Sequence, residues 1–150
     1  MSAEILCLGE PLIEFVLRED GLYQRSIGGD TSNAAVAAAK QGASVGYLTS
    51  LGPGRFGDAV IDYWKEEGID AAYVTRHPTA QTGLNFVEPD PAERYFTYRR
   101  EGSAASLMQP NDLPEQAIKA AKCLHLSGIT LAISNELRDT AFAAIGIAKT

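Results

Sequence analysis

The residues best suited to binding a ligand are the pair Gly28-Gly29 and the polar run 30–33 behind it. Glycine lacks a Cβ and tolerates unusual backbone angles, so two glycines let the main chain come close to a bound molecule. An alanine-rich stretch follows and predicts a helix, with Asp30, Thr31 or Ser32 as its cap. The first turn of such a helix carries unpartnered N–H groups. The segment predicts a site for a small polar molecule, although a tight turn into a buried helix would use the same residues.

A second group of chemically capable side chains lies in the extended run 94–100. Alternate residues of a strand share a face, so one face is expected to carry Arg94, Phe96, Tyr98 and Arg100, and the other Tyr95, Thr97 and Arg99. A guanidinium offers two parallel donors to a carboxylate, and a tyrosine hydroxyl beside it adds a third. Tyr98 and Arg100 are therefore predicted to form a carboxylate clamp. An exposed strand with solubilising arginines fits the composition equally well.

The segment 52–57, GPGRFG, matches the G-x-G-x-x-G pattern of dinucleotide sites between a predicted strand and a predicted helix. It follows the second strand of the α/β order rather than the first, and Pro53 stiffens the turn. The acid expected at the end of the next strand is replaced by Arg76. These features favour a structural strand–helix turn over a dinucleotide site.

Composition restricts the class of protein and its partners. The 150 residues are 45% hydrophobic and 21% charged, which suits one folded domain. A net charge of −6 argues against nucleic acid and anionic membranes as partners. Cys7 and Cys123 lie far apart without metal-site spacing, and no apolar run is long enough to span a membrane. We expect a cytoplasmic location.

Apolar strand-like runs alternate with helix-like segments along most of the chain, which predicts a parallel sheet covered by helices. The expected strands are 5–8, 45–51, 72–75 and 123–126, and the expected helices are 31–41, 57–67, 112–122 (capped by Asp112) and 134–150. Two extended pairs interrupt this order, at 12–28 and at 82–100 with its continuation to 103. Such antiparallel pieces favour a separate small layer, a lid over the edge of the sheet.

The ordered motifs resemble the N-terminal half of the ribokinase-like (PfkB-type) carbohydrate kinases, and within them the 2-keto-3-deoxygluconate kinases. The resemblance covers essentially all 150 residues. It rests on Gly9-Glu10-Pro11, GGDTSNAAVAAAKQGA (28–43), GYLTSLGPGRFG (46–57), Thr82-Gly83-Leu84, FTYRREGSA (96–104) and LHLSGITLAIS (124–134). It implies a doubly wound α/β fold with a β-sheet lid that closes over the sugar and often pairs with the lid of a second subunit.

The resemblance also implies roles for individual residues. Gly28, Gly29, Asp30 and Asn33 would bind the sugar, with Glu14 and Asn85 as weaker candidates, and Tyr98 and Arg100 would hold the carboxylate of a keto acid. ATP and Mg²⁺ are the implied cofactors. The implied partners are a small sugar or sugar acid and a second copy of the chain through the lid.

Some positions depart from the family pattern. Thr31 replaces a small residue, Gly54 replaces an acid, and Asn85 stands where tyrosine often follows Thr-Gly-Leu. The G-A-G-D motif, whose aspartate is the family's general base, has no counterpart in these residues, and no catalytic residue is assigned. We therefore expect the sugar-binding half of a sugar-acid kinase. The alternatives are a kinase of a neutral sugar such as fructose or ribose, or a non-catalytic sugar-binding or dimerisation module if the protein ends at Thr150.

Overall fold

A parallel sheet forms the centre of the molecule. The computed structural model describes residues 3–150, in which four strands pair in the order β5-β4-β1-β8 with every pair parallel. Their bounds are β1 Ile5–Leu8, β4 Val45–Leu51, β5 Val74–Arg76 and β8 Cys123–His125. Every residue of β4 is buried, as expected for a strand covered on both faces.

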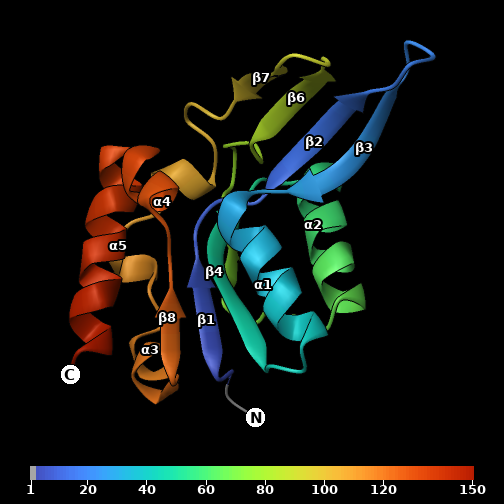
Figure 1. The fold of residues 1–150 in the computed structure, drawn as a ribbon. Helices are drawn as coiled ribbons and strands as arrows, with labels where there is room; N and C mark the ends of the chain where they lie inside the picture. The colour runs from blue at the N-terminus through green and yellow to red at the C-terminus, as the bar shows by residue number, and fades with distance from the viewer. Residues whose placement is uncertain (1–2) are drawn as a thin grey trace.

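Helices cover both faces of this sheet, as Figure 1 shows. One side carries α1 Asp30–Lys40 and α2 Arg55–Glu66, and the other carries α3 Glu115–Ala120, α4 Gly128–Ala132 and α5 Asn135–Ala148. The two sides bury separate apolar clusters, one around Trp64 and the other around Leu137. Successive residues of β4 alternate between the clusters, Tyr47 joining the first and Leu48 the second. The predicted doubly wound α/β arrangement is confirmed.

The two extended pairs form a second sheet that is separate from the first. Its strands are β2 Leu12–Leu17, β3 Tyr23–Gly28, β6 Leu84–Pro89 and β7 Arg94–Arg99, in the order β3-β2-β6-β7. Each pair is an antiparallel hairpin, and a parallel pairing of β2 with β6 joins the two hairpins. The prediction of a separate small layer is confirmed.

One face of the second sheet packs against the core. Ile13 is fully buried in the cluster that contains α2, and Phe15 packs beside it against Phe56 with ring centroids 6.1 Å apart. Since strand residues alternate, the neighbours of Ile13 and Phe15 in the chain point to the opposite face. Polar residues such as Glu14 therefore lie on the face of the second sheet that does not pack against the core.

Two predicted helix starts are wrong. The helix α3 begins at Glu115 after Pro114, because the Asp112 carboxylate accepts a hydrogen bond from the backbone N–H of Gln109, 2.8 Å away, and closes a short 3₁₀ turn instead. The helix α2 begins at Arg55, two residues earlier than predicted. The start of α5 is confirmed.

The helix α4 was not predicted, and β5 begins at Val74 rather than at residue 72. Only five residues form α4, which is too short for helical periodicity to reveal. A contact with a distant strand anchors it, since the Thr130 hydroxyl donates to the backbone oxygen of Leu8 in β1 at 3.1 Å.

Candidate functional site

Three of the predicted site residues lie side by side across the second sheet. Glu14 in β2 is directly opposite Asn85 in β6, and Asn85 is directly opposite Tyr98 in β7. Directly opposite residues point to the same face, so this register places a carboxylate, an amide and a phenol in one row. The next position along β7 on that face is Arg100, which follows the end of the strand.

Gly28 and Gly29 form the end of the sheet beside this row. Gly28 lies opposite Leu12 at the end of β3, and a Cβ at Gly28 would overlap the carboxylate of Glu14. Gly29 has φ +104°, and a Cβ there would lie 2.5 Å from the backbone oxygen of Glu10. Both glycines allow close approach of neighbouring chain segments. Gly28 leaves room for the carboxylate of Glu14, a candidate sugar-binding residue.

Asp30 and Asn33 open α1 with exposed side chains. The predicted side-chain cap is wrong, because the N-cap is Gly29 and no side chain caps the helix. The other two cap candidates are turned into the core: Thr31 bonds the Tyr47 hydroxyl at 2.5 Å, and Ser32 accepts from the Trp64 indole at 3.0 Å. These bonds fix the first turn of α1.

Tyr98 and Arg100 occupy the same side of β7, as the alternation predicted. The Phe96 and Tyr98 rings stack with centroids 6.2 Å apart, and the Arg100 guanidinium carbon lies 5.0 Å from the centre of the Tyr98 ring. Tyr98 is 45% exposed. A cation over an aromatic face is stabilised by about 0.5–1 kcal/mol at exposed sites, so the contact favours this arrangement of the two side chains.

Arg100 is also paired with a buried acid, Glu10, to which the sequence analysis assigned no role. Its Nε and Nη2 both lie 2.6 Å from Oε2 of Glu10, whose side chain is fully buried. The Ser103 hydroxyl donates to Oε1 of the same carboxylate. Burial raises the pKa of Glu10, while Arg100 and Ser103 oppose the rise. The signal in the sequence was an acid between Gly9 and Pro11, directly after a buried strand.

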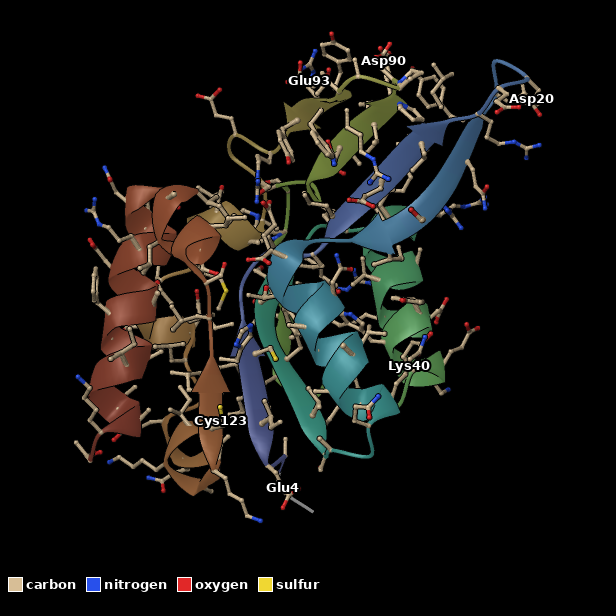
Figure 2. The ribbon with its side chains drawn as sticks, in the orientation of Figure 1. Glu4, Asp20, Lys40, Asp90, Glu93 and Cys123 are labelled. Atoms are coloured by element: carbon tan, nitrogen blue, oxygen red, sulfur yellow. The ribbon has the colours of Figure 1, made fainter. Side chains whose placement is uncertain are left out.

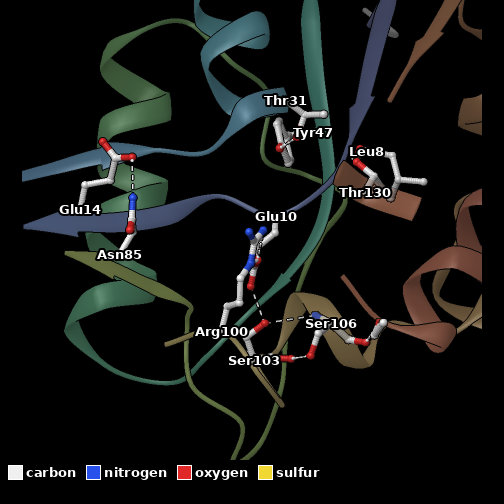
Figure 3. A network of polar contacts seen from close by, with 11 residues as sticks. Leu8, Glu10, Glu14, Thr31, Tyr47, Asn85, Arg100, Ser103, Ser106 and Thr130 are labelled. Atoms are coloured by element: carbon white, nitrogen blue, oxygen red, sulfur yellow. Dashed lines mark hydrogen bonds and ion pairs between the residues drawn. The ribbon is translucent and has the colours of Figure 1, made fainter. Parts of the chain in front are cut away.

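The amide of Asn85 is incompletely bonded. Its Nδ2 donates weakly to Oε1 of Glu14 at 3.5 Å, and its Oδ1 is buried with no hydrogen-bond partner among residues 3–150. Leaving a buried acceptor unpaired costs about 1–3 kcal/mol. Figure 3 shows this pair at the side of the Glu10–Arg100 network. The unpaired oxygen suits a donor such as a sugar hydroxyl.

Arg100 also lines a hollow of about 660 Å³, together with Ser106, Ser134 and residues of α4. A larger hollow of about 930 Å³ lies elsewhere, at the tips of the hairpins, between Asp20 and Asp90. Figure 2 labels these two acids at the far end of the second sheet. None of the predicted site residues lines the larger hollow, and Arg100 alone among them lines the smaller one.

The Arg76 side chain occupies the space inside the loop 52–57. Arg76 donates to the backbone oxygen of Gly52 at 2.8 Å and pairs with Asp58, and a Cβ at Gly57 would overlap the Arg76 guanidinium. Gly57 therefore makes room for Arg76, whereas a Cβ on Gly52 would meet the backbone of residues 80–82. This arrangement favours the structural turn over a dinucleotide site.

Within residues 3–150, no group of three or more His, Cys, Asp or Glu side chains could hold a metal ion. No residue of this range is therefore assigned to the Mg²⁺ that the family resemblance implies, and we derive no step through it. No helix in the same range is long and apolar enough to cross a membrane.

Comparison with known proteins gives one consistent result. The family described as pfkB family carbohydrate kinase matches residues 2–150. A 2-dehydro-3-deoxygluconokinase of Thermoproteus tenax is 32% identical over 154 residues, covering 97% of this chain and 47% of that protein. A 5-dehydro-2-deoxygluconokinase of Clostridium perfringens is 33% identical over 135 residues, covering 89% of this chain and 40% of that protein.

The fold has the same relatives. A fructokinase of Xylella fastidiosa with bound ATP superposes with a TM-score of 0.90 at 27% identity, covering 99% of this chain and 46% of that one. The chain thus spans about half the length of the relatives it matches.

Proposed function

Because this chain belongs to the pfkB family of carbohydrate kinases, we propose that it contributes the sugar-binding part of an ATP-dependent kinase of 2-keto-3-deoxygluconate or a related sugar acid. In that reaction the terminal phosphoryl group of ATP passes to a hydroxyl of the sugar acid, that hydroxyl loses its proton, and ADP leaves. The observation that carries the proposal is the position of Arg100 at the end of the row formed by Glu14, Asn85 and Tyr98.

Each residue of the row has a role that suits its chemistry. Tyr98 and Arg100 would bind the substrate carboxylate, because a guanidinium with free N–H groups donates two parallel hydrogen bonds to a carboxylate. Glu14 and Asn85 would bind hydroxyls, since together they offer carboxylate oxygens and an unpaired amide oxygen.

The remaining predicted residues lie at the end of the sheet. Gly28 and Gly29 would let the main chain approach the sugar, and Asp30 and Asn33 would present exposed polar groups from the start of α1. Binding of the sugar through several hydroxyls would orient it for transfer, and positioning supplies much of the rate in phosphoryl transfer.

A neutral-sugar kinase is the second candidate, and one observation favours it. Arg100 is already paired with Glu10, so its charge is balanced before any substrate arrives. A fructokinase is also among the structural relatives. The names of the two curated relatives, both kinases of dehydro-deoxy-gluconate compounds, favour the sugar acid.

The test is a comparison of two substrates with the full-length protein. ADP release would be measured with ATP and either 2-keto-3-deoxygluconate or fructose. We expect kcat/KM at least about tenfold higher for the keto acid, equivalent to about 1.4 kcal/mol of discrimination. A higher kcat/KM for fructose would replace the proposal with the second candidate.

We also propose that two copies associate through the second sheet. Its outer strand β7 exposes two aromatic side chains, with Tyr95 56% and Phe96 50% exposed. Exposed apolar groups on an outer strand favour association. Sedimentation of the full-length protein, with and without Tyr95→Lys, would test this, and a monomer at all concentrations would contradict it.

A further inference from the structure

Glu10 lies where the chain crosses from one sheet to the other. It follows β1 of the parallel sheet and precedes β2 of the second sheet, while Arg100 follows β7. The two residues are 90 positions apart in the chain, yet the Arg100 Nε lies 2.6 Å from Glu10 Oε2. The pair therefore fixes the end of β7 to the junction between the sheets.

The pairing uses only one edge of the guanidinium. Nε and Nη2 both approach Oε2, and a guanidinium has five N–H donors in a planar fork. The two donors of Nη1 and one of Nη2 are left for other acceptors. One face of the guanidinium lies against the Tyr98 ring. Two of the side chain's degrees of freedom, its tilt and its in-plane rotation, are thus set by Tyr98 and Glu10.

A series of hydrogen bonds through serine residues fixes the Glu10 carboxylate on the side away from Arg100, and Figure 3 shows part of it. Ser103 donates to Oε1 of Glu10, and its hydroxyl accepts from the backbone N–H of Ser106 at 3.3 Å. The Ser106 hydroxyl donates to the backbone oxygen of Ser103 at 2.7 Å. Ser134, the N-cap of α5, donates to the backbone oxygen of Ser106 at 2.6 Å. The carboxylate is therefore anchored to a helix of the main layer.

The space around Glu10 leaves no room for a ligand. Its side chain is fully buried, and a Cβ on Gly83 would lie 2.6 Å from Oε1. Both carboxylate oxygens already accept from Arg100 or Ser103. A carboxylate so placed cannot bind the sugar or take a proton from it, and its influence on the site must pass through Arg100.

We propose that Glu10 is the positioning residue for Arg100, holding the guanidinium so that its free N–H edge meets the substrate carboxylate. The inference rests on the proposed function for the identity of that carboxylate. The pairing of Glu10 with Arg100 is itself independent of any substrate. One measurement tests this pairing, and a second tests its effect on binding of the substrate carboxylate.

The first measurement needs no sugar. In the full-length protein, the Nε–H signal of Arg100 would be assigned in nitrogen-15 NMR spectra by its loss in Arg100→Lys. We expect slow exchange with solvent in the wild type, because the hydrogen is bonded to a buried carboxylate, and at least about tenfold faster exchange in Glu10→Gln. Rapid exchange in the wild type, or no change in Glu10→Gln, would overturn the positioning role whatever the substrate is.

The second measurement is kinetic. We expect Glu10→Gln to raise KM for 2-keto-3-deoxygluconate about tenfold or more and to change KM for fructose less than about twofold, because only the acid needs Arg100. Glu10→Asp keeps the charge but shortens the side chain, and we expect it to raise KM for the acid as well. Glu101→Gln, beside Arg100 in the chain and exposed, is the matched control.

A double variant decides whether Glu10 acts through Arg100. In an Arg100→Ala background, Glu10→Gln should cause no further rise in KM for the acid. A further rise in that background, or equal losses with the acid and with fructose, would make Glu10 a general structural residue and overturn the inference. Absence of turnover of any sugar acid by the wild type would instead contradict the proposed function, and the NMR result would still decide the positioning role.

Discussion

Asn85 lies 71 positions after Glu14 in the chain, and their side chains meet across the parallel pairing of β2 and β6, with Asn85 Nδ2 3.5 Å from Glu14 Oε1. The amide oxygen of Asn85 is buried and meets no donor in the part of the chain that the structure describes. An acceptor left unpaired inside a protein reduces its stability. A substrate hydroxyl that donates to this oxygen would remove that cost, so the site has a specific requirement that binding can meet.

Replacement of Asn85 by leucine should separate binding from stability. We expect KM for the sugar acid to rise about tenfold or more, because the acceptor is lost, at the scale of about 1–3 kcal/mol for a buried polar contact. The melting temperature should fall little, since the variant removes an unpaired polar atom. Thr97→Val, on the opposite face of β7, is the control. An unchanged KM would exclude Asn85 from the site.

Arg100→Ala should weaken binding of the acid selectively. We expect KM for 2-keto-3-deoxygluconate to rise about 10- to 100-fold, the size of a lost charge-assisted hydrogen bond of about 1.5–3 kcal/mol, with a much smaller effect on fructose. Arg99 is the matched control, because it is the adjacent arginine, is exposed and bonds only the backbone oxygen of Tyr98 among the described residues. Equal losses for both sugars, or equal effects of Arg99→Ala and Arg100→Ala, would contradict the carboxylate clamp.

Two glycines with positive φ should differ in their tolerance of alanine. At Gly29 a Cβ would meet the backbone of Glu10, whereas at Gly42, with φ +89°, nothing lies within 4 Å. Gly42→Ala should cost about 1–2 kcal/mol from backbone strain alone. Gly29→Ala should cost more than about 3 kcal/mol, because overpacking adds to the strain. Urea unfolding of the full-length variants measures both, and equal losses would show that the contact with Glu10 relaxes freely.

The pH dependence of stability should carry the signature of Glu10. Its pKa is raised in the folded protein by burial, so the contribution of this group is fully present below its unfolded pKa near 4.5 and is lost as the pH rises through the folded pKa. The unfolding free energy of the wild type, minus that of Glu10→Gln, should therefore fall as the pH rises from 4 towards neutral and then level off. A difference that rises with pH would mean that attraction to Arg100 outweighs burial.

Local patterns were sufficient to predict the strands of both sheets and their division into two layers, but not the parallel pairing of β2 with β6. The alternation along 94–100 placed Tyr98 and Arg100 on one face, and their contact at 5.0 Å agrees. The capping of α1 could not be predicted in the same way, because Thr31 and Ser32 are good caps in isolation. Their hydroxyls are instead bonded to Tyr47 and Trp64, which come from distant elements.

The pairing of Glu10 with Arg100 was also beyond local reasoning. Both residues are common types at the ends of strands, and only the path of the chain between the two sheets brings them together. The short helix α4 was missed for a related reason, since its anchor is a hydrogen bond from Thr130 to β1. Contacts between segments far apart in the sequence decide these features.

The parallel joint between β2 and β6 has a consequence for the order of folding. The chain between these strands runs through α1, β4, α2 and β5, and closing so long a loop is entropically unfavourable until the elements within it are in place. The hairpin of β2 and β3 involves neighbouring residues and needs no such step. We therefore expect the joint to close late in folding. Glu14 and Asn85 face each other across the pairing of β2 with β6. The row of site residues would therefore be completed only after the parallel sheet and its helices have formed.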